Sequence, residues 1–183
     1  MSTTRLLILG ILTDKPRHGY DIRRELELWD AEQWANIAYG SIYSALNTLA
    51  KDGYIEAVNA ASTEQKRPTA RTEYAITPRG QGEFERLLRE YWWTPKPMID
   101  PFQAALTFMH KMPRDELLAA LHYRADALRP VTRSLEYVIK GKMGNPSTPR
   151  HIAESVRLTF AHMETELRWI EEAIGKVERG ELP

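Results

Sequence analysis

The sequence has no cysteine, no long apolar run and no net charge, and each absence excludes a class of protein. Without cysteine, its 183 residues contain no disulfide framework, no thiolate nucleophile and no cysteine-ligated metal site. No apolar run approaches the roughly 18 residues of a membrane span, and the N-terminus lacks a signal-peptide pattern, so we expect a cytoplasmic protein without a membrane partner. Its 25 basic and 25 acidic residues balance, which argues against a protein that coats nucleic acid non-specifically.

Enzyme motifs are also missing. The sequence has no Gly-x-Ser-x-Gly motif, phosphate-binding loop or dinucleotide fingerprint. His18 lies in an expected turn, where a structural role is favoured over that of a general base. The pairs His162–Glu166 and His151–Glu154 have helical spacing, and each could supply two metal ligands. A metal site needs three or four ligands, and no third is obvious nearby. We therefore expect no enzymatic activity, no metal and no cofactor.

The most informative stretch is residues 39–53. At a helical advance of about 100° per residue, one face is apolar and the opposite face carries short polar side chains with one lysine. The apolar face comprises Ile42, Ala45, Leu46, Leu49 and Ala50; the polar face comprises Ser44, Asn47, Thr48 and Lys51, with Tyr43 on the boundary. Gly53 follows the last periodic residue, as expected at a helix C-terminus. Short donors and acceptors can contact base edges in the DNA major groove, although simple solvent exposure could produce the same face.

A predicted hairpin follows this helix directly. Residues 54–58 and 73–77 have strand character, and the second segment places Tyr74 and Ile76 on one face. The polar loop between them contains Lys66, Arg67 and Arg71. From residue 65 to residue 80 the local charge is +3, from four basic residues and one acidic residue. A polar-faced helix followed by a hairpin with a basic tip is typical of a winged helix-turn-helix.

The remaining N-terminal elements are helices. Residues 3–12 form an apolar run that we expect to be buried on several sides, and residues 15–19 form a predicted turn. A second helix over residues 20–29 should place Ile22, Leu26 and Trp29 inward. Thr77 and Pro78 give an N-cap followed by proline at the first helical position. The helix that they begin should bury Phe84, Leu87, Leu88 and Tyr91 and end near Trp92 and Trp93.

Residues 94–97 (Thr-Pro-Lys-Pro) form a stiff break, which divides the chain into predicted domains 1–94 and 95–183. In the second domain, Asp100 and Pro101 begin a helix expected to reach about residue 111. Pro113 begins a longer helix that Pro130 should kink or end early. Its inner stripe is expected to contain Leu117, Leu121, Ala125, Leu128, Leu135 and Ile139.

After a predicted loop at residues 141–149, the last helix should run from residue 150 to about residue 179. Its apolar residues alternate at spacings of four and three, a 3.5-residue period that favours a coiled-coil seam. The seam residues are Val156, Phe160, Met163, Leu167, Ile170, Ile174 and Val177. A homodimer is the favoured explanation, although a helix pair within one chain could show the same pattern.

Several segments together resemble the PadR-type bacterial transcriptional regulators: residues 18–22 (HGYDI), 40–46 (GSIYSAL), 53–56 (GYIE) and 72–80 (TEYAITPRG). The second half is similar to the virulence-activator-like helical domain of longer PadR members. The resemblance implies a homodimer that binds a short inverted repeat in double-stranded DNA, usually as a repressor, and that often dissociates when a small aromatic or phenolic molecule binds. Ala75 stands where the strands of family wings often have arginine.

The sequence thus predicts a mainly α protein with a small β-hairpin, an N-terminal winged helix-turn-helix and a C-terminal helical dimerisation domain. A winged-helix module that binds a protein partner, without specific DNA binding, is the alternative. The predicted DNA-binding residues are Tyr39, Ser41, Tyr43, Ser44, Asn47, Thr48, Lys51, Lys66, Arg67 and Arg71. An effector pocket between the two domains is predicted from Tyr91, Trp92, Trp93, Phe102, Phe108 and His110, although these rings could simply form interdomain core.

Overall fold

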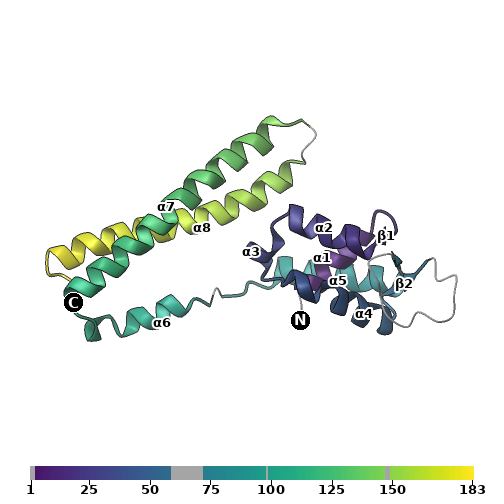
Figure 1. Cartoon of the computed structure of the whole chain (residues 1–183), viewed down its shortest axis with the longest axis horizontal. Helices are drawn as coiled ribbons and strands as arrows, with labels where there is room; N and C mark the ends of the chain where they lie inside the picture. Colours follow the sequence, from purple (N-terminus) through teal and green to yellow (C-terminus); the bar gives the residue numbers. More distant parts are fainter. Residues whose placement is uncertain (1–2, 59–71, 98, 147–148) are drawn as a thin grey trace. The chain divides into compact units, whose positions relative to one another are not determined.

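A computed structural model describes residues 3–58, 72–97, 99–146 and 149–183 (Figure 1). The chain divides into two compact units, Met1–Pro97 and Met98–Pro183, called here the N-terminal and C-terminal units. Both are mainly helical, and a small antiparallel sheet lies in the N-terminal unit, so the predicted fold class is confirmed. The predicted wing residues Lys66, Arg67 and Arg71 lie outside the described residues. None of the helices in the described part of the chain combines the length and apolar character of a membrane span.

Helix α1 (Thr3–Leu12) forms the centre of the N-terminal unit, with the bounds predicted from its apolar run. It contacts α4 (Ile42–Lys51), α5 (Pro78–Trp93) and β3 (Glu73–Ile76). Because it is covered on several sides, Ile8 and Leu9 are completely buried, and Phe84 of α5 packs against Gly10. The predicted burial of this helix is confirmed.

The segment before α4 is more elaborate than predicted. Helix α2 (Gly19–Leu28) buries Ile22 and Leu26, as expected, but Trp29 is 42% exposed. The inward placement of Trp29 was therefore wrong, because α2 ends at Leu28 and Asp30 adopts a left-handed φ of 52° that turns the chain. A short helix, α3 (Ala31–Ala35), and a 3-10 turn, η1 (Tyr39–Ser41), then lead into α4.

The sheet has three strands in the order β1–β3–β2. Strand β2 (Ile55–Ala57) pairs with β3 in the register Ile55 to Ile76, which confirms the predicted hairpin. Strand β1 (Arg17–His18) lies on the other side of β3, within residues that we predicted to form only a turn. Tyr74 of β3 is 2% exposed, and this burial raises the pKa of its phenol.

Helix α5 begins as predicted. The Thr77 hydroxyl accepts a hydrogen bond from the Gly80 N–H (3.1 Å) and lies 2.8 Å from the Gly53 carbonyl, to which it donates. Along the helix, Leu87 is fully buried, whereas Leu88 is 39% exposed. The buried face of α5 is therefore narrower than the spacing of its apolar residues predicted.

The C-terminal unit consists of α6 (Pro101–Thr107), η2 (Met109–Lys111), α7 (Arg114–Gly144) and α8 (Arg150–Glu178). The Asp100 carboxylate caps α6 by accepting from the Phe102 N–H at 2.8 Å. Helix α6 ends at Thr107, earlier than predicted, and η2 takes its place up to Lys111. Helices α7 and α8 lie side by side and antiparallel (Figure 1), and their core joins Leu117, Leu121 and Ala125 of α7 to Ile170 and Ala173 of α8, among others.

Helix α7 continues through Pro130 to Gly144, so the predicted early end was wrong and the loop before α8 is shorter than residues 141–149. Proline removes one backbone donor and crowds the preceding turn, which favours a helix break. The packing of α8 along α7 opposes that tendency. In the same region the Thr132 hydroxyl donates to the carbonyls of Arg129 (2.9 Å) and Leu128 (3.2 Å), so its buried polar group is satisfied within the helix.

The predicted seam on α8 is divided. Ile170, Ile174 and Val177 are buried within the chain, in the core shared with α7. Val156, Phe160, Met163 and Leu167 are half-buried. Packing within one chain therefore accounts for the C-terminal part of the 3.5-residue pattern, and the N-terminal part of α8 retains accessible apolar surface.

Candidate functional site

The polar face of α4 is exposed along the helix. Ile42, Leu46 and Leu49 are buried in the core, at most 2% exposed, which fixes the rotation of the helix about its axis. Ser44, Asn47, Thr48 and Lys51 are consequently all exposed, as the sequence predicted. This ten-residue helix is roughly 15 Å long, enough to place short polar groups along several base pairs of a major groove.

The hydrogen-bonding groups of this face are partly satisfied within the protein. Thr48 donates its hydroxyl proton to the Ser44 carbonyl (3.0 Å), and Ser41 donates to the Ala38 carbonyl (2.7 Å). Both hydroxyl oxygens keep lone pairs that can accept from a ligand. Among the described residues, the Asn47 side chain has no hydrogen-bond partner, so its amide can both donate to and accept from an external group.

The two tyrosines of this region are held by the N-terminal unit. The Tyr39 hydroxyl accepts from the Glu32 N–H and donates to the Leu26 carbonyl, both at 3.3 Å, and thereby connects the end of α2 to α3 and η1. Tyr43 is half-buried, and its ring packs against the core beside Gly19. Tyr43 can present an edge of its ring from the boundary of the polar face, whereas the hydroxyl of Tyr39 is engaged in fixing the loop before α4.

The C-terminus of α4 is closed by a Schellman motif. Gly53 has a φ of 74°, a conformation that glycine adopts without strain. The Gly53 N–H donates to Ala50 (3.0 Å), and the Tyr54 N–H donates to Leu49 (2.9 Å). The Tyr54 ring lies near two guanidinium groups, that of Arg79 at 4.8 Å and that of Arg5 at 5.1 Å from the ring centroid.

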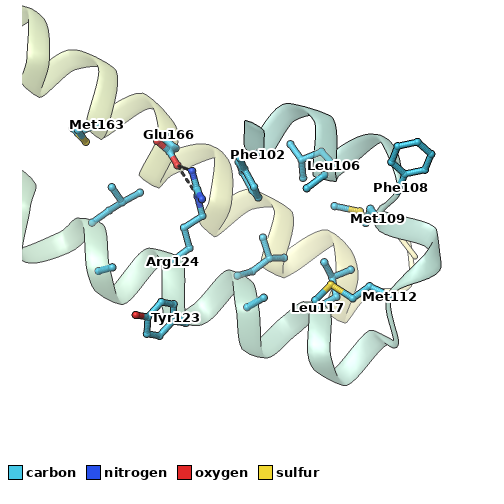
Figure 2. Close-up of a pocket in the computed structure, with 15 residues that line it drawn as sticks. Phe102, Leu106, Phe108, Met109, Met112, Leu117, Tyr123, Arg124, Met163 and Glu166 are labelled. Atoms are coloured by element: carbon cyan, nitrogen blue, oxygen red, sulfur yellow. Dashed lines mark hydrogen bonds and ion pairs between the residues drawn. The ribbon is translucent and has the colours of Figure 1, made fainter. Parts of the chain in front are cut away.

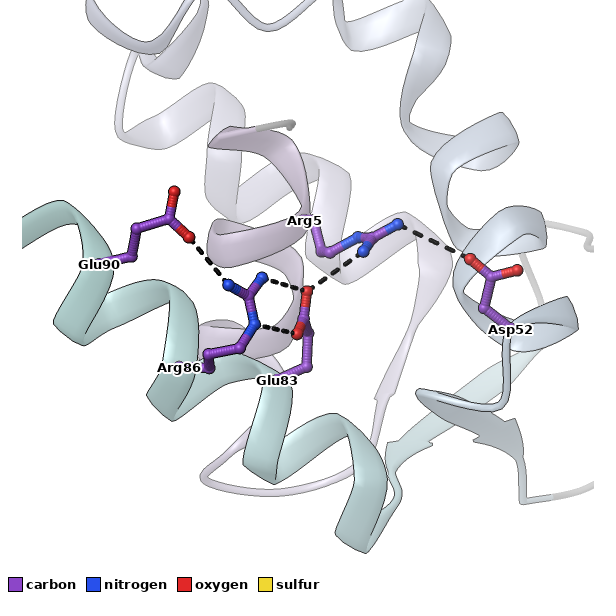
Figure 3. Close-up of polar contacts among 5 residues, drawn as sticks. All are labelled: Arg5, Asp52, Glu83, Arg86 and Glu90. Atoms are coloured by element: carbon purple, nitrogen blue, oxygen red, sulfur yellow. Dashed lines mark hydrogen bonds and ion pairs between the residues drawn. The ribbon is translucent and has the colours of Figure 1, made fainter. Parts of the chain in front are cut away.

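A cluster of charged side chains that no sequence motif marks connects α4 to α1 and α5 (Figure 3). Glu83 accepts from Arg86 (2.8 Å) and from Arg5 (3.2 Å), and Arg5 also pairs with Asp52 at 3.7 Å. Arg86 additionally pairs with Glu90 at 2.9 Å. These bonds, chiefly the one from Arg86, lower the pKa of Glu83 below its ordinary value of 4.5.

We expect Glu83→Gln to lower the free energy of unfolding at neutral pH by about 1–2 kcal/mol, because two arginines lose their shared anionic partner. Since the pKa of Glu83 is lowered by folding, its stabilisation is present above the unfolded-state pKa and is lost as the pH falls through the folded-state value. The difference between wild type and variant should therefore shrink in acid. Urea unfolding at several pH values measures it.

Glu85→Gln is the matched control, because Glu85 pairs with Arg89 on the exposed side of the same helix at 3.2 Å. Its effect should stay below about 0.5 kcal/mol. Equal effects of the two substitutions would show that the cluster is unimportant.

The C-terminal unit contains a cavity of about 630 Å³, bounded by α6, η2, α7 and α8 (Figure 2). Its wall is mostly apolar, and its charged groups are Arg124 of α7 and Glu166 of α8. The Arg124 Nε and terminal nitrogen bond one oxygen of Glu166 at 2.7 and 2.6 Å. The lining residues are Phe102, Ala105, Leu106, Phe108, Met109, Met112, Leu117, Ala120, Leu121, Tyr123, Arg124, Ala127, Leu128, Met163 and Glu166.

The predicted effector residues are distributed between the two units. Phe102 and Phe108 line the cavity, whereas His110, exposed in η2, does not. Tyr91, Trp92 and Trp93 belong to the end of α5; Tyr91 is half-buried, and the two tryptophans are 81% and 84% exposed. Sequence spacing identified two rings of the cavity but missed Arg124 and Glu166, which are far apart in sequence and carry no local signal.

The histidine pairs do not extend into larger clusters. Glu166, which has helical spacing to His162, is bonded to Arg124. Among the residues that the structure describes, no three His, Asp or Glu side chains lie close enough to hold a metal ion.

The N-terminal unit therefore has the arrangement of a winged helix-turn-helix domain, with an exposed polar helix followed by a hairpin, and it is joined to a helical C-terminal unit. Residues 8–86 match the model of the Transcriptional regulator PadR-like family, so this part of the chain is similar to that family. No curated protein matches the chain in sequence.

Solved structures share the fold over nearly the whole chain. Bacillus subtilis PadR in complex with operator DNA is 18% identical, with 97% of this chain and 98% of that chain covered and a TM-score of 0.75. B. subtilis PadR in complex with p-coumaric acid is 19% identical, with coverages of 95% and 98% and a TM-score of 0.77. The Vibrio cholerae virulence activator AphA is 18% identical, with coverages of 97% and 99% and a TM-score of 0.75.

Proposed function

We propose that this protein is a cytoplasmic regulator that binds an inverted-repeat operator as a homodimer, acts as a repressor and is released by a small aromatic effector. The observation that carries the proposal is the exposed face of α4, where Ser44, Asn47 and Thr48 lie in a row with buried residues behind them. B. subtilis PadR, which shares the fold, forms a complex with operator DNA.

The residues of the interface have distinct roles in this proposal. Tyr43, Ser44, Asn47 and Thr48 contact base edges, because short side chains on an exposed helix face fit the major groove. Ser41 and Lys51 bond phosphates near the two ends of the helix. The wing contributes Lys66, Arg67 and Arg71, and Tyr39 positions the loop before α4.

Homodimerisation is proposed through the N-terminal part of α8, where Val156, Phe160, Met163 and Leu167 are half-buried and Leu158 is 61% exposed. This apolar surface is the part of the seam that α7 leaves uncovered. A second copy would remove it from water, and a dimer would supply two α4 helices for the two half-sites of an inverted repeat.

An aromatic effector is supported by the C-terminal cavity, which already contains Phe102 and Phe108. B. subtilis PadR forms a complex with p-coumaric acid. The contributions of Tyr91, Trp92, Trp93 and His110 to effector binding remain predictions.

Selection of bound sites from random DNA tests the function directly. We expect an inverted repeat whose half-sites are separated by about one helical turn, and sedimentation of the same protein should give a dimer. A selected site without dyad symmetry would contradict the homodimeric arrangement. Failure to enrich any sequence would favour the protein-interaction alternative.

A further inference from the structure

We propose that the cavity of the C-terminal unit is a binding site for an uncharged, hydroxylated aromatic molecule and that it disfavours aromatic carboxylates. Its volume of about 630 Å³ lies within the usual range for small-molecule sites. The walls are formed by rings, methionine side chains and aliphatic groups, such as Phe102, Met109 and Leu121. Such a wall favours a flat apolar body and leaves selectivity to the few polar groups present.

The wall of the cavity formed by Phe102 is held in place by neighbouring side chains in the absence of a ligand. The Arg124 guanidinium lies 3.8 Å from the centroid of the Phe102 ring, and the Trp169 ring meets Phe102 edge-on, with centroids 5.9 Å apart. Asp100, which caps α6, lies 3.7 Å from Arg124. Phe102 is therefore held before a ligand arrives, so little ordering is required on binding.

The positive charge of Arg124 is already countered by two carboxylates. Two of its nitrogens bond Glu166 at 2.7 and 2.6 Å, and Asp100 is a second carboxylate nearby. A ligand carboxylate would have to displace Glu166 or lie close to it, and the repulsion between the two like charges opposes its binding. An uncharged ligand neither displaces Glu166 nor is repelled by its charge.

Glu166 also provides a hydrogen-bond acceptor. Both bonds from Arg124 end on the same oxygen, Oε1. Within the described part of the chain, the other oxygen, Oε2, has no donor, and Glu166 lines the cavity. An aromatic hydroxyl could donate to it, and a hydrogen bond to a charged acceptor is among the stronger ones. The polar end of the cavity is therefore suited to a hydroxyl group.

A ligand bound here would contact the helix that follows α5 in the chain. That helix, α6, forms one wall of the cavity and is connected to α5 by residues 94–100. A ligand that fixes α6 against α7 fixes one end of that segment. That this regulates operator binding rests on the proposed function; the binding site itself does not.

Calorimetry on the full chain without DNA tests the site with two matched probes, a naphthol and the corresponding naphthoate. We expect the wild type to bind the naphthol at least about tenfold more tightly than the naphthoate. Glu166→Gln removes the negative charge and frees Arg124, so the preference should reverse. Glu171→Gln is the control, because Glu171 pairs with Arg129 across the same two helices (2.9 Å) but does not line the cavity. It should leave the preference unchanged.

Ala127→Phe, on the exposed side of α7 but lining the cavity, should abolish naphthol binding without lowering the melting temperature. The proposal is overturned if the naphthoate binds the wild type as tightly as the naphthol. It is also overturned if Ala127→Phe binds normally, or if neither probe binds because a second copy of the chain fills the cavity. Operator affinity is measured separately on the same proteins, so a failure of the proposed function is distinguishable from a failure of this site.

Discussion

Replacing Gly80 by alanine should lower the free energy of unfolding by about 3 kcal/mol or more. A Cβ at this position would lie 2.0 Å from the Tyr54 carbonyl oxygen and 2.8 Å from Ile76 Cγ1. The helix start would have to move away, which would break the Thr77 cap and the bond from the Thr77 N–H to Tyr54 (3.1 Å). Denaturant unfolding of the full chain measures the loss.

Gly82→Ala on the same helix is the control, because a Cβ there meets nothing within 4 Å. Alanine has a higher helix propensity than glycine, so this variant should be more stable by about 0.5–1 kcal/mol. If Gly80→Ala were as well tolerated as Gly82→Ala, the close approach of the Tyr54 carbonyl to the start of α5 would not exist in solution.

Asn47→Ala should weaken binding to the selected operator by about 1–3 kcal/mol, or roughly 5- to 150-fold. The Asn47 amide is exposed in the middle of the polar face of α4, where it can form two hydrogen bonds to an adenine. Its removal should also relax the preference at one position of each half-site. Binding to the operator and to single-base variants of it, at fixed salt, measures both effects.

Lys51→Ala tests the opposite behaviour, because this side chain lies in the last turn of α4 and is proposed to contact phosphate. It should weaken binding to all sequences alike. The slope of log affinity against log salt concentration should also fall by about one unit, because one fewer counterion is released. Unchanged operator affinity in Asn47→Ala would mean that another surface contacts the bases.

The parts of the fold predicted correctly are those specified by neighbours in sequence. The two faces of α4 follow from a regular apolar spacing, and its end follows from Gly53. The start of α5 follows from Thr77 and Pro78. Such signals act within one helical turn, so they do not depend on contacts with distant parts of the chain.

The parts that were missed depend on contacts between distant residues. Strand β1 is two residues long and exists because Arg17 and His18 meet β3, more than fifty residues later. Trp29 has the spacing of a buried residue, but the left-handed turn at Asp30 follows immediately, and no sequence period reveals where a helix stops. Pro130 has a strong local preference to break a helix, which the packing of α8 against α7 overrides.

The candidate sites show the same division. The polar face of α4 belongs to one helix and could be predicted, whereas the cavity is formed by four elements that meet only in the folded chain. Arg124 and Glu166 are ordinary charged residues in the sequence. On α8 the 3.5-residue period correctly marked a packed face, but a period carries no information about whether the partner is α7 or a second chain.

The hydroxyl of Thr77 fixes the start of α5 to the end of α4. It joins the carbonyl of Gly53, where α4 ends, to the first turn of α5, and Arg5 and Glu83 fasten α5 to α1 further along. Helix α5 is 16 residues long, roughly 24 Å from this anchored start to Trp93. Because these contacts fasten α5 to both α4 and α1, we expect a displacement at Trp93 to rotate the N-terminal unit as one body, and a rotation of a few degrees corresponds to about an ångström at the end of the helix.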